Sequence, residues 1–305
     1  MTGFTEIASG LRFPEGPIAM DDGSIVLVEI ARGTLSRVTP DGKVSVIAEL
    51  GGGPNGAAIG PDGAVYVCNN GGFEWHDRDG VLIPGDKPAD YSGGRIERVD
   101  LSTGKVDVLY TECDGAPLNG PNDIVFDKQG GFWFTDLGKS YDRVTDRGAL
   151  YYAMPDGSSI AQQAFPLNTP NGVGLSPAED KVYFADTVAG RLWSLDIERP
   201  GVAKAPDAPL PANLVAGVPG LQFFDSLAVD AEGNICVATI FNGGITSISP
   251  DGQTITHTPL PDLLVTNICF GGPDLRTAYI TLSGTGKLVK MDWPVAGLPL
   301  NFLNK

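Results

Sequence analysis

The 305-residue sequence predicts an all-β fold, a six-bladed β-propeller, from three observations. Two short apolar runs joined by a Gly-containing turn form a hairpin-like unit, clearest in residues 119–136. This unit occurs six times, with successive copies 40, 67, 49, 54 and 42 residues apart. No long amphipathic helical pattern interrupts the copies, and 41 Gly and 24 Pro suit many tight turns. Repeats of this length built from short strands are typical of propeller blades.

Each copy opens with a polar residue, which we call its anchor. In four copies a Gly follows the anchor by eight residues, where the first two strands turn (Gly23, Gly63, Gly130 and Gly233). The six anchors are Glu15, Asn55, Asn122, Asn171, Asp225 and Asn267.

The ends of the chain indicate how the ring closes. The last copy supplies only three strands, at about 267–271, 276–282 and 286–292, whereas a short strand at 4–8 precedes the first copy. We expect the N-terminal strand to complete the last blade, because closure removes the exposed edges of a sheet. Residues 1–305 are therefore predicted to form a single propeller domain.

Strand direction assigns the loops to two faces. Because each anchor begins the innermost strand of its blade, all six should lie at one end of the central channel, together with the loops that join second and third strands. Two of these loops are long, at about 70–92 and 137–147. Long loops on a rigid scaffold often carry function. Trp75 and Tyr141 either wall a pocket there or hold their loops in place; the Pro-rich segment 199–211 is expected to be a plain loop.

Composition excludes several partners. A formal charge of −16 makes nucleic acid an unfavourable partner. The sequence contains no run of 18 apolar residues and no basic-then-apolar start, so we expect no membrane span and no export signal. Cys68, Cys113, Cys236 and Cys269 are scattered, which favours buried free thiols and a cytoplasmic location.

The anchors indicate a metal site. Carboxylate and amide oxygens are hard ligands that suit calcium, magnesium or manganese, whereas zinc prefers His or Cys and the chain has two His. Such residues also cap turns at strand entrances. Six of them in register favour the metal, because a buried unpaired carboxylate in a channel is costly. Gly-x-Ser-x-Gly is absent, and Ser283–Lys287 is too short for a phosphate-binding loop.

At these residues the chain resembles the senescence-marker-protein/gluconolactonase/luciferin-regenerating-enzyme family of six-bladed propellers. The motifs are 13–17 (FPEGP), 120–123 (GPND), 169–172 (TPNG), 224–226 (FDS) and 266–275 (TNICFGGPDL). The resemblance implies one divalent metal ion, with calcium preferred and magnesium, manganese, zinc or iron(II) as alternatives. It also implies hydrolysis of a small-molecule lactone or ester. The implied metal ligands are Glu15, Asn122, Asn171 and Asp225.

The same resemblance assigns the catalytic roles. Asp225 is expected to act as general base or nucleophile, and Asn122 to position metal and substrate. We expect substrate contacts from Asn55, Trp75, Tyr141 and Phe224. Sugar-lactone members often carry Arg where this chain has Gly120, so a more apolar lactone is a possibility. A phosphotriester or fluorophosphate hydrolase and a non-catalytic binding propeller are the alternatives, and the oligomeric state stays open.

Overall fold

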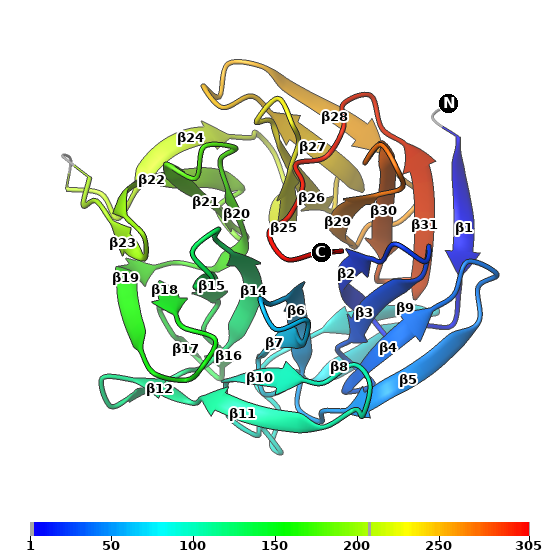
Figure 1. The fold of residues 1–305 in the computed structure, drawn as a ribbon, viewed down its shortest axis with the longest axis horizontal. Helices are drawn as coiled ribbons and strands as arrows, with labels where there is room; N and C mark the ends of the chain where they lie inside the picture. The colour runs from blue at the N-terminus through cyan, green and yellow to red at the C-terminus, as the bar shows by residue number, and fades with distance from the viewer. Residues whose placement is uncertain (1–2, 207–208, 305) are drawn as a thin grey trace.

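In the described residues, six antiparallel sheets, five with four strands and one with five, surround a central axis, which confirms the predicted six-bladed β-propeller (Figure 1). The computed structural model describes residues 3–206 and 209–304, and these contain strands and turns without a helix. From the axis outward, blade 1 comprises β2 (Pro14–Ala19), β3 (Ile25–Glu29), β4 (Thr34–Val38) and β5 (Val44–Glu49); blade 2 comprises β6 (Pro54–Ile59), β7 (Val65–Asn69), β10 (Arg95–Val99) and β11 (Val106–Tyr110); blade 3 comprises β14 (Pro121–Phe126), β15 (Phe132–Asp136), β18 (Gly148–Ala153) and β19 (Ile160–Leu167).

Blades 4 to 6 follow the same plan. Blade 4 comprises β20 (Pro170–Leu175), β21 (Lys181–Asp186), β22 (Arg191–Arg199) and β24 (Asn213–Gly217); blade 5 comprises β25 (Phe223–Val229), β26 (Ile235–Ile240), β27 (Gly244–Ile248) and β28 (Ile255–Pro259); blade 6 comprises β29 (Val265–Gly271), β30 (Thr277–Leu282), β31 (Lys287–Asp292) and β1 (Phe4–Ala8).

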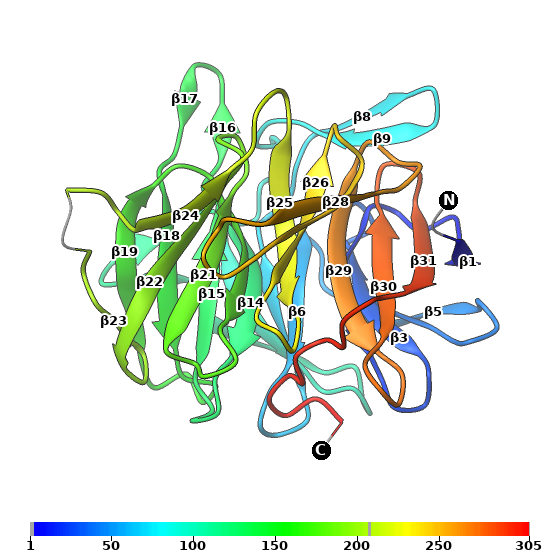
Figure 2. The same cartoon turned by 90° about the horizontal axis from the view of Figure 1, so that it is seen from above.

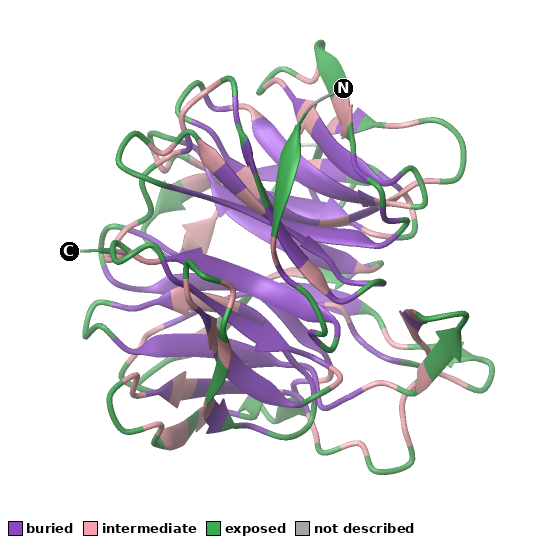
Figure 3. Ribbon diagram, turned by 90° about the vertical axis from the view of Figure 1, so that its right-hand side faces the viewer, coloured by how far each residue is buried: buried purple, intermediate pink, exposed green. Residues whose placement is uncertain are grey.

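The N-terminal strand closes the ring as predicted. β1 pairs with β31, with Phe4 opposite Met291 and Glu6 opposite Val289. Blade 6 therefore contains both ends of the repeat, and β1 forms its exposed outer edge (Figure 3). An exposed ion pair between Lys287 and Glu6, 2.9 Å long, lies at this junction.

The core consists of apolar clusters between neighbouring blades, one at each of the six blade interfaces. Between blades 2 and 3, for example, Tyr66 and Phe132 pack with ring centroids 5.9 Å apart. The inner strands are buried on both faces (Figure 3), so their sequences are apolar runs rather than alternating patterns. All four cysteines are free and buried, as predicted.

Glycines directly after three anchors let the inner strands approach one another closely. A Cβ at Gly16 would lie 2.7 Å from the amide nitrogen of Ala57, and one at Gly172 would lie 2.6 Å from that of Leu227. Gly56 is confined in the same way by the backbone of blade 3. A side chain at these positions would therefore push neighbouring blades apart around the channel.

The two faces of the ring differ (Figure 2). One carries the hairpins β8 (Trp75–Arg78)–β9 (Val81–Pro84) and β16 (Ser140–Tyr141)–β17 (Val144–Thr145), which lie within the two predicted long loops. The chain after β31 runs across the opposite face, an arrangement that the sequence analysis did not anticipate (Figure 2). Two short additions complete the fold: β12 (Glu112–Cys113) with β13 (Ala116–Pro117), and β23 (Val202–Ala203) beside β22. The segment 199–211 therefore contains a short strand as well as loop, and its residues 207 and 208 lie outside the described part.

Candidate metal centre and its surroundings

Every innermost strand has a β-bulge at or beside its anchor. In β14, for example, Pro121 pairs with Asp136 and Ile124 with Phe134, which leaves the two residues between them out of the ladder. The other five inner strands shift register at the same point. A β-bulge changes the direction in which the side chains at the end of a strand point. The anchors can therefore point away from the apolar core between the blades. Five anchors are buried, whereas Asp225 is partly exposed.

Glu15 is held in place by two donors. Its Oε2 accepts a 2.6 Å hydrogen bond from the side-chain amide of Asn267 and a 2.8 Å bond from the amide of Gly16. Since Asn267 begins the inner strand of blade 6 and Glu15 that of blade 1, this contact joins two anchors across the ring closure.

The channel concentrates negative charge. Burial, foremost, and then the neighbouring Glu15 carboxylate raise the pKa of Asp225 well above its usual value, and burial likewise raises the pKa of Glu15. Within residues 3–206 and 209–304, neither carboxylate forms an ion pair with Lys, Arg or His. A bound cation would relieve this repulsion and favour the ionised form of both groups.

Two anchor amides offer further oxygen atoms. Asn122 is 3% exposed, and its Oδ1 is a buried atom with no hydrogen-bond partner in the described structure. An unpaired buried acceptor is costly, and a cation is one partner that this oxygen could accept. The Oδ1 of Asn171 accepts only a long bond, 3.4 Å, from the hydroxyl of Ser226.

Together these groups fit a divalent cation. The set provides two carboxylates and two amide oxygens, the chemistry that hard cations such as calcium prefer. The described residues contain no group of three or more His, Cys, Asp or Glu side chains that could hold a metal ion, so a metal site here would depend on the amide oxygens.

Sequence analysis missed Asp123, a third carboxylate in the channel. It occupies the position after the anchor, where three other copies have Gly. Its two oxygens accept bonds from the amides of Ile124 (3.0 Å) and Val173 (3.1 Å), so it ties blade 3 to blade 4. Burial and the charge of Glu15 raise the pKa of Asp123 to about 8. The presence of Asp where three other copies have Gly was the feature of the sequence that could have identified this residue.

Gly120, the position that departs from sugar-lactone members, is enclosed. A Cβ there would lie 2.5 Å from the carbonyl oxygen of Gly138. The carboxylate of Asp136 accepts bonds from the amides of Asn119, Gly120 and Gly138, at 2.8, 2.7 and 2.9 Å. The loop after β15 thus packs directly against the segment leading to Asn122, and this leaves no room for a larger residue.

The β8–β9 hairpin reaches from blade 2 to blade 6. The amide of Leu82 donates to the carbonyl of Gly284 at 2.9 Å. Trp75 packs against Phe13, two residues before Glu15, with ring centroids 5.1 Å apart. They share an apolar cluster with Leu264 and Phe73. This packing holds the hairpin in place, and contact of Trp75 with substrate stays a prediction.

Lys139 joins the two long loops. Its Nζ donates to the carbonyl of Gly72 (2.6 Å) and to Oδ1 of Asn70 (3.1 Å), and lies 3.7 Å from the centre of the Phe73 ring. The side chain is 3% exposed. Burial lowers the pKa of Lys139 to about 7, against the attraction of Asp136.

The remaining predicted substrate contacts lie in different environments. Tyr141 is at the tip region of β16–β17, where its hydroxyl donates to Asp146 at 3.2 Å. Asn55 is buried near the start of β6, among the anchors. Phe224 is fully buried in the cluster between blades 4 and 5, so its side chain supports Asp225 from the core.

Fold and site together define a six-bladed propeller with a ring of oxygen donors across its channel. A sequence model described as the SMP-30/gluconolactonase/LRE-like region matches residues 13–284, and the chain belongs to this family. The chain is 27% identical to a gluconolactonase of Zymomonas mobilis, over 91% of this chain and 78% of that protein. It is 29% identical to lactonase drp35 of Staphylococcus saprophyticus, over 78% of this chain and 67% of that protein.

A solved structure shares the fold. The calcium-binding protein regucalcin from Agrobacterium tumefaciens superposes with a TM-score of 0.76 at 20% identity, covering 98% of this chain and 97% of that chain. In the part of this chain that the structure describes, no helix is long and apolar enough to cross a membrane.

Proposed function

We propose that this protein is a metal-dependent hydrolase that opens a lactone ring. The observation that carries the proposal is the pairing of two neighbouring channel carboxylates, Glu15 and Asp225, with the unpartnered Oδ1 of Asn122. Relatives that bear the names gluconolactonase and lactonase support the same reaction class.

Glu15, Asn122, Asn171 and Asp225 would hold one divalent cation, for which we favour calcium. When bound, the cation would polarise the lactone carbonyl and stabilise the negative charge that develops on its oxygen. Glu15 acts as a fixed ligand, because Asn267 and Gly16 orient its carboxylate. Asn122 contributes its free oxygen and positions the substrate beside the site.

Asp225 is our candidate for proton transfer. It is the one anchor with partial exposure among the described residues, and its side chain accepts a single recorded backbone bond, 3.1 Å from the amide of Ser226. It can therefore reach an incoming water and accept its proton as general base. Direct attack by the carboxylate is the alternative. Such attack would form a mixed anhydride and release the ring oxygen as an alcohol after protonation. Label found in Asp225 after single turnover in H₂¹⁸O, from water attack on the side-chain carbonyl carbon, would identify Asp225 as the nucleophile.

The substrate walls come from the long loops and from Asn55. We propose Asn55, Trp75 and Tyr141 as substrate contacts, with a lactone less polar than a sugar lactone, since the enclosed Gly120 excludes an arginine. The experiment is a pH-indicator hydrolysis assay on sugar, aliphatic and aromatic lactones. Chelator-stripped protein is tested with calcium, magnesium, manganese, zinc or iron(II) added back.

A rate that one ion restores on one lactone group would support the proposal and identify ion and substrate class together. Hydrolysis that persists without metal would contradict the ligand assignment. Absence of lactone hydrolysis with every ion, alongside turnover of a phosphotriester, would replace the proposal with an organophosphate hydrolase on the same site.

A further inference from the structure

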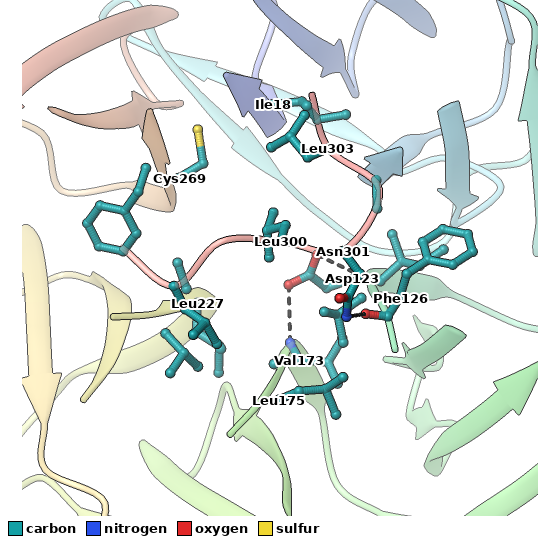
Figure 4. A pocket seen from close by; sticks show the side chains of 18 of the residues that line it. Ile18, Asp123, Phe126, Val173, Leu175, Leu227, Cys269, Leu300, Asn301 and Leu303 are labelled. Carbon is teal, nitrogen blue, oxygen red and sulfur yellow. Dashed lines mark hydrogen bonds between the residues drawn. The ribbon is translucent and has the colours of Figure 1, made fainter. Parts of the chain in front are cut away.

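A cavity of about 230 Å³ lies in the channel below the anchors (Figure 4). All six blades contribute apolar side chains to its wall, one from each being Ile18, Ile59, Phe126, Leu175, Leu227 and Phe270. These six side chains offer water no hydrogen-bond partners, so an apolar molecule that covers them would be bound favourably.

The C-terminal segment forms the floor of this cavity. Leu298, Leu300 and Leu303 line it from the face opposite the long loops (Figures 2 and 4). Hydrogen bonds attach the segment on both sides of Leu300: the amide of Leu298 donates to the carbonyl of Val229, the side-chain amide of Asn301 donates to the carbonyl of Phe126 at 3.1 Å, and that of Asn304 donates to the carbonyl of Ala19 at 3.0 Å. Leu300 is 45% exposed while lining the cavity, so its side chain lies at the boundary between the cavity and solvent.

The cavity is separate from the candidate metal centre. None of Glu15, Asn122, Asn171 or Asp225 is among its lining residues, although Gly16, Asp123 and Asn267 form its upper rim.

Two carboxyl groups lie at the cavity wall and bear on the class of ligand. They are Asp123 and Glu179, both acidic. Asp123 is engaged by two amides, and Glu179 accepts a 2.7 Å bond from Asn301 and a 3.1 Å bond from the amide of Lys128. The described lining contains no basic residue to attract an anion, and both carboxyl groups already accept hydrogen bonds, so the wall favours a neutral molecule that covers its apolar part.

We propose that this cavity is a second ligand site, which binds one small neutral apolar molecule, aromatic or alicyclic, through the floor at Leu300. Cavities of about 150 Å³ with such walls stay dry and bind benzene, so this one accommodates about nine or ten carbon atoms. An apolar pocket with few polar groups is the usual form of a small-molecule site. The proposal is independent of the lactonase proposal, because it uses none of the metal ligands.

The test uses 2-fluoronaphthalene as probe, with binding followed by ¹⁹F NMR and calorimetry on the full-length protein. Wild type should bind one equivalent, both with calcium and after chelation. Leu300→Trp, which fills the cavity from the floor, should weaken binding at least tenfold. Leu221→Trp is the matched control, because Leu221 is exposed and lies outside the lining, and it should bind as wild type does. Lactone hydrolysis in Leu300→Trp should stay within twofold of wild type.

Several outcomes would overturn the proposal: no saturable binding to wild type, equal binding by Leu300→Trp, or loss of the probe on chelation or on adding lactone. If Leu300→Trp fails to fold, as judged by its thermal transition, the test is a crystal structure of the wild-type protein under xenon pressure. Xenon density between Leu175 and Leu227 supports the site, and its absence there rejects it.

Discussion

Asn267 donates its side-chain N–H to the carboxylate of Glu15 at 2.6 Å, across the junction of the last and first blades. The two residues are 252 positions apart in the chain. The packing of inner strand β29 against β2 therefore also determines the orientation of a proposed metal ligand. This contact connects the stability of the ring with the geometry of the site.

Asn267→Ala should weaken both properties. Removing the donor leaves the buried Glu15 carboxylate short of one partner, which costs about 1–3 kcal/mol of unfolding free energy. Metal should also bind more weakly, and this is measured as a smaller rise in melting temperature on calcium addition. Asn242→Ala, which removes an exposed bond to Gln222, is the control. An unchanged calcium response in Asn267→Ala would show that Glu15 needs no such support.

Asp225→Asn should reduce kcat by about 10²–10⁴-fold, the usual contribution of a general base. The amide keeps the shape of the side chain but cannot accept the proton from water. Circular dichroism and the melting temperature of the variant check that its fold is retained. Wild-type turnover in a folded Asp225→Asn protein would remove this residue from the mechanism.

Lys139 should make stability depend on pH above neutrality. Burial lowers the pKa of Lys139 to about 7 in the folded protein, against the ordinary value of 10.5 for a lysine. Between these values the unfolded chain holds the proton and the folded chain does not, so raising the pH favours folding. Below about pH 7 both forms are protonated and the cost of burying the charge is fully present. Asp136 raises this pKa, and Lys87 lowers it.

Denaturant unfolding of wild type and Lys139→Met from pH 6 to 10 measures the effect. Above pH 7, the unfolding free energy of wild type should rise relative to that of Lys139→Met by about 1.4 kcal/mol per pH unit. Lys87→Met, in the same loop pair but not in the buried site, should retain most of this slope. A pH-independent difference between wild type and Lys139→Met would mean that Lys139 stays protonated throughout.

Gly120→Ala should disturb the approach to Asn122. Its Cβ would lie 2.5 Å from the carbonyl oxygen of Gly138, so the loop after β15 must move, at a cost of about 1–3 kcal/mol. We expect a lower melting temperature and a raised KM. Gly217→Ala is the control, because the nearest side-chain atom to a Cβ there is 3.5 Å away. Equal melting temperatures of the two variants would show that the loop after β15 can move to accommodate the added methyl group without a loss of stability.

Asn301→Ala should loosen the C-terminal segment. Asn301 donates to the carbonyl of Phe126 and to Glu179, in blades 3 and 4, and loss of both bonds costs about 1–3 kcal/mol. Hydrogen exchange should then increase for the amides of Gly297 and Leu298, which bond to Leu275 and Val229. The exposed Asn168→Ala serves as control. Unchanged hydrogen exchange in Asn301→Ala would show that the leucine side chains, and not Asn301, hold the C-terminal segment in place.

Much of the architecture follows from local patterns in the chain. The spacing of the anchors predicted six blades, and the three-strand last copy predicted that residues 4–8 would complete it, because blade boundaries repeat in sequence. The direction of each strand also predicted which loops share a face with the anchors. These features depend on neighbouring residues and on strand alternation, which a single sequence displays.

The features that needed the tertiary structure join positions far apart in the chain. Asp123 meets Val173 in the next blade, Lys139 meets Gly72 in another loop, and Leu300 covers the channel formed by all six blades. No local sequence pattern predicts these contacts, because each depends on how the closed ring brings the inner strands and loops together. The sequence by itself thus determined the blades, their order and the residues at the channel mouth. The folded ring decided which of those residues are paired, charged or free, because burial and distance exist only after closure.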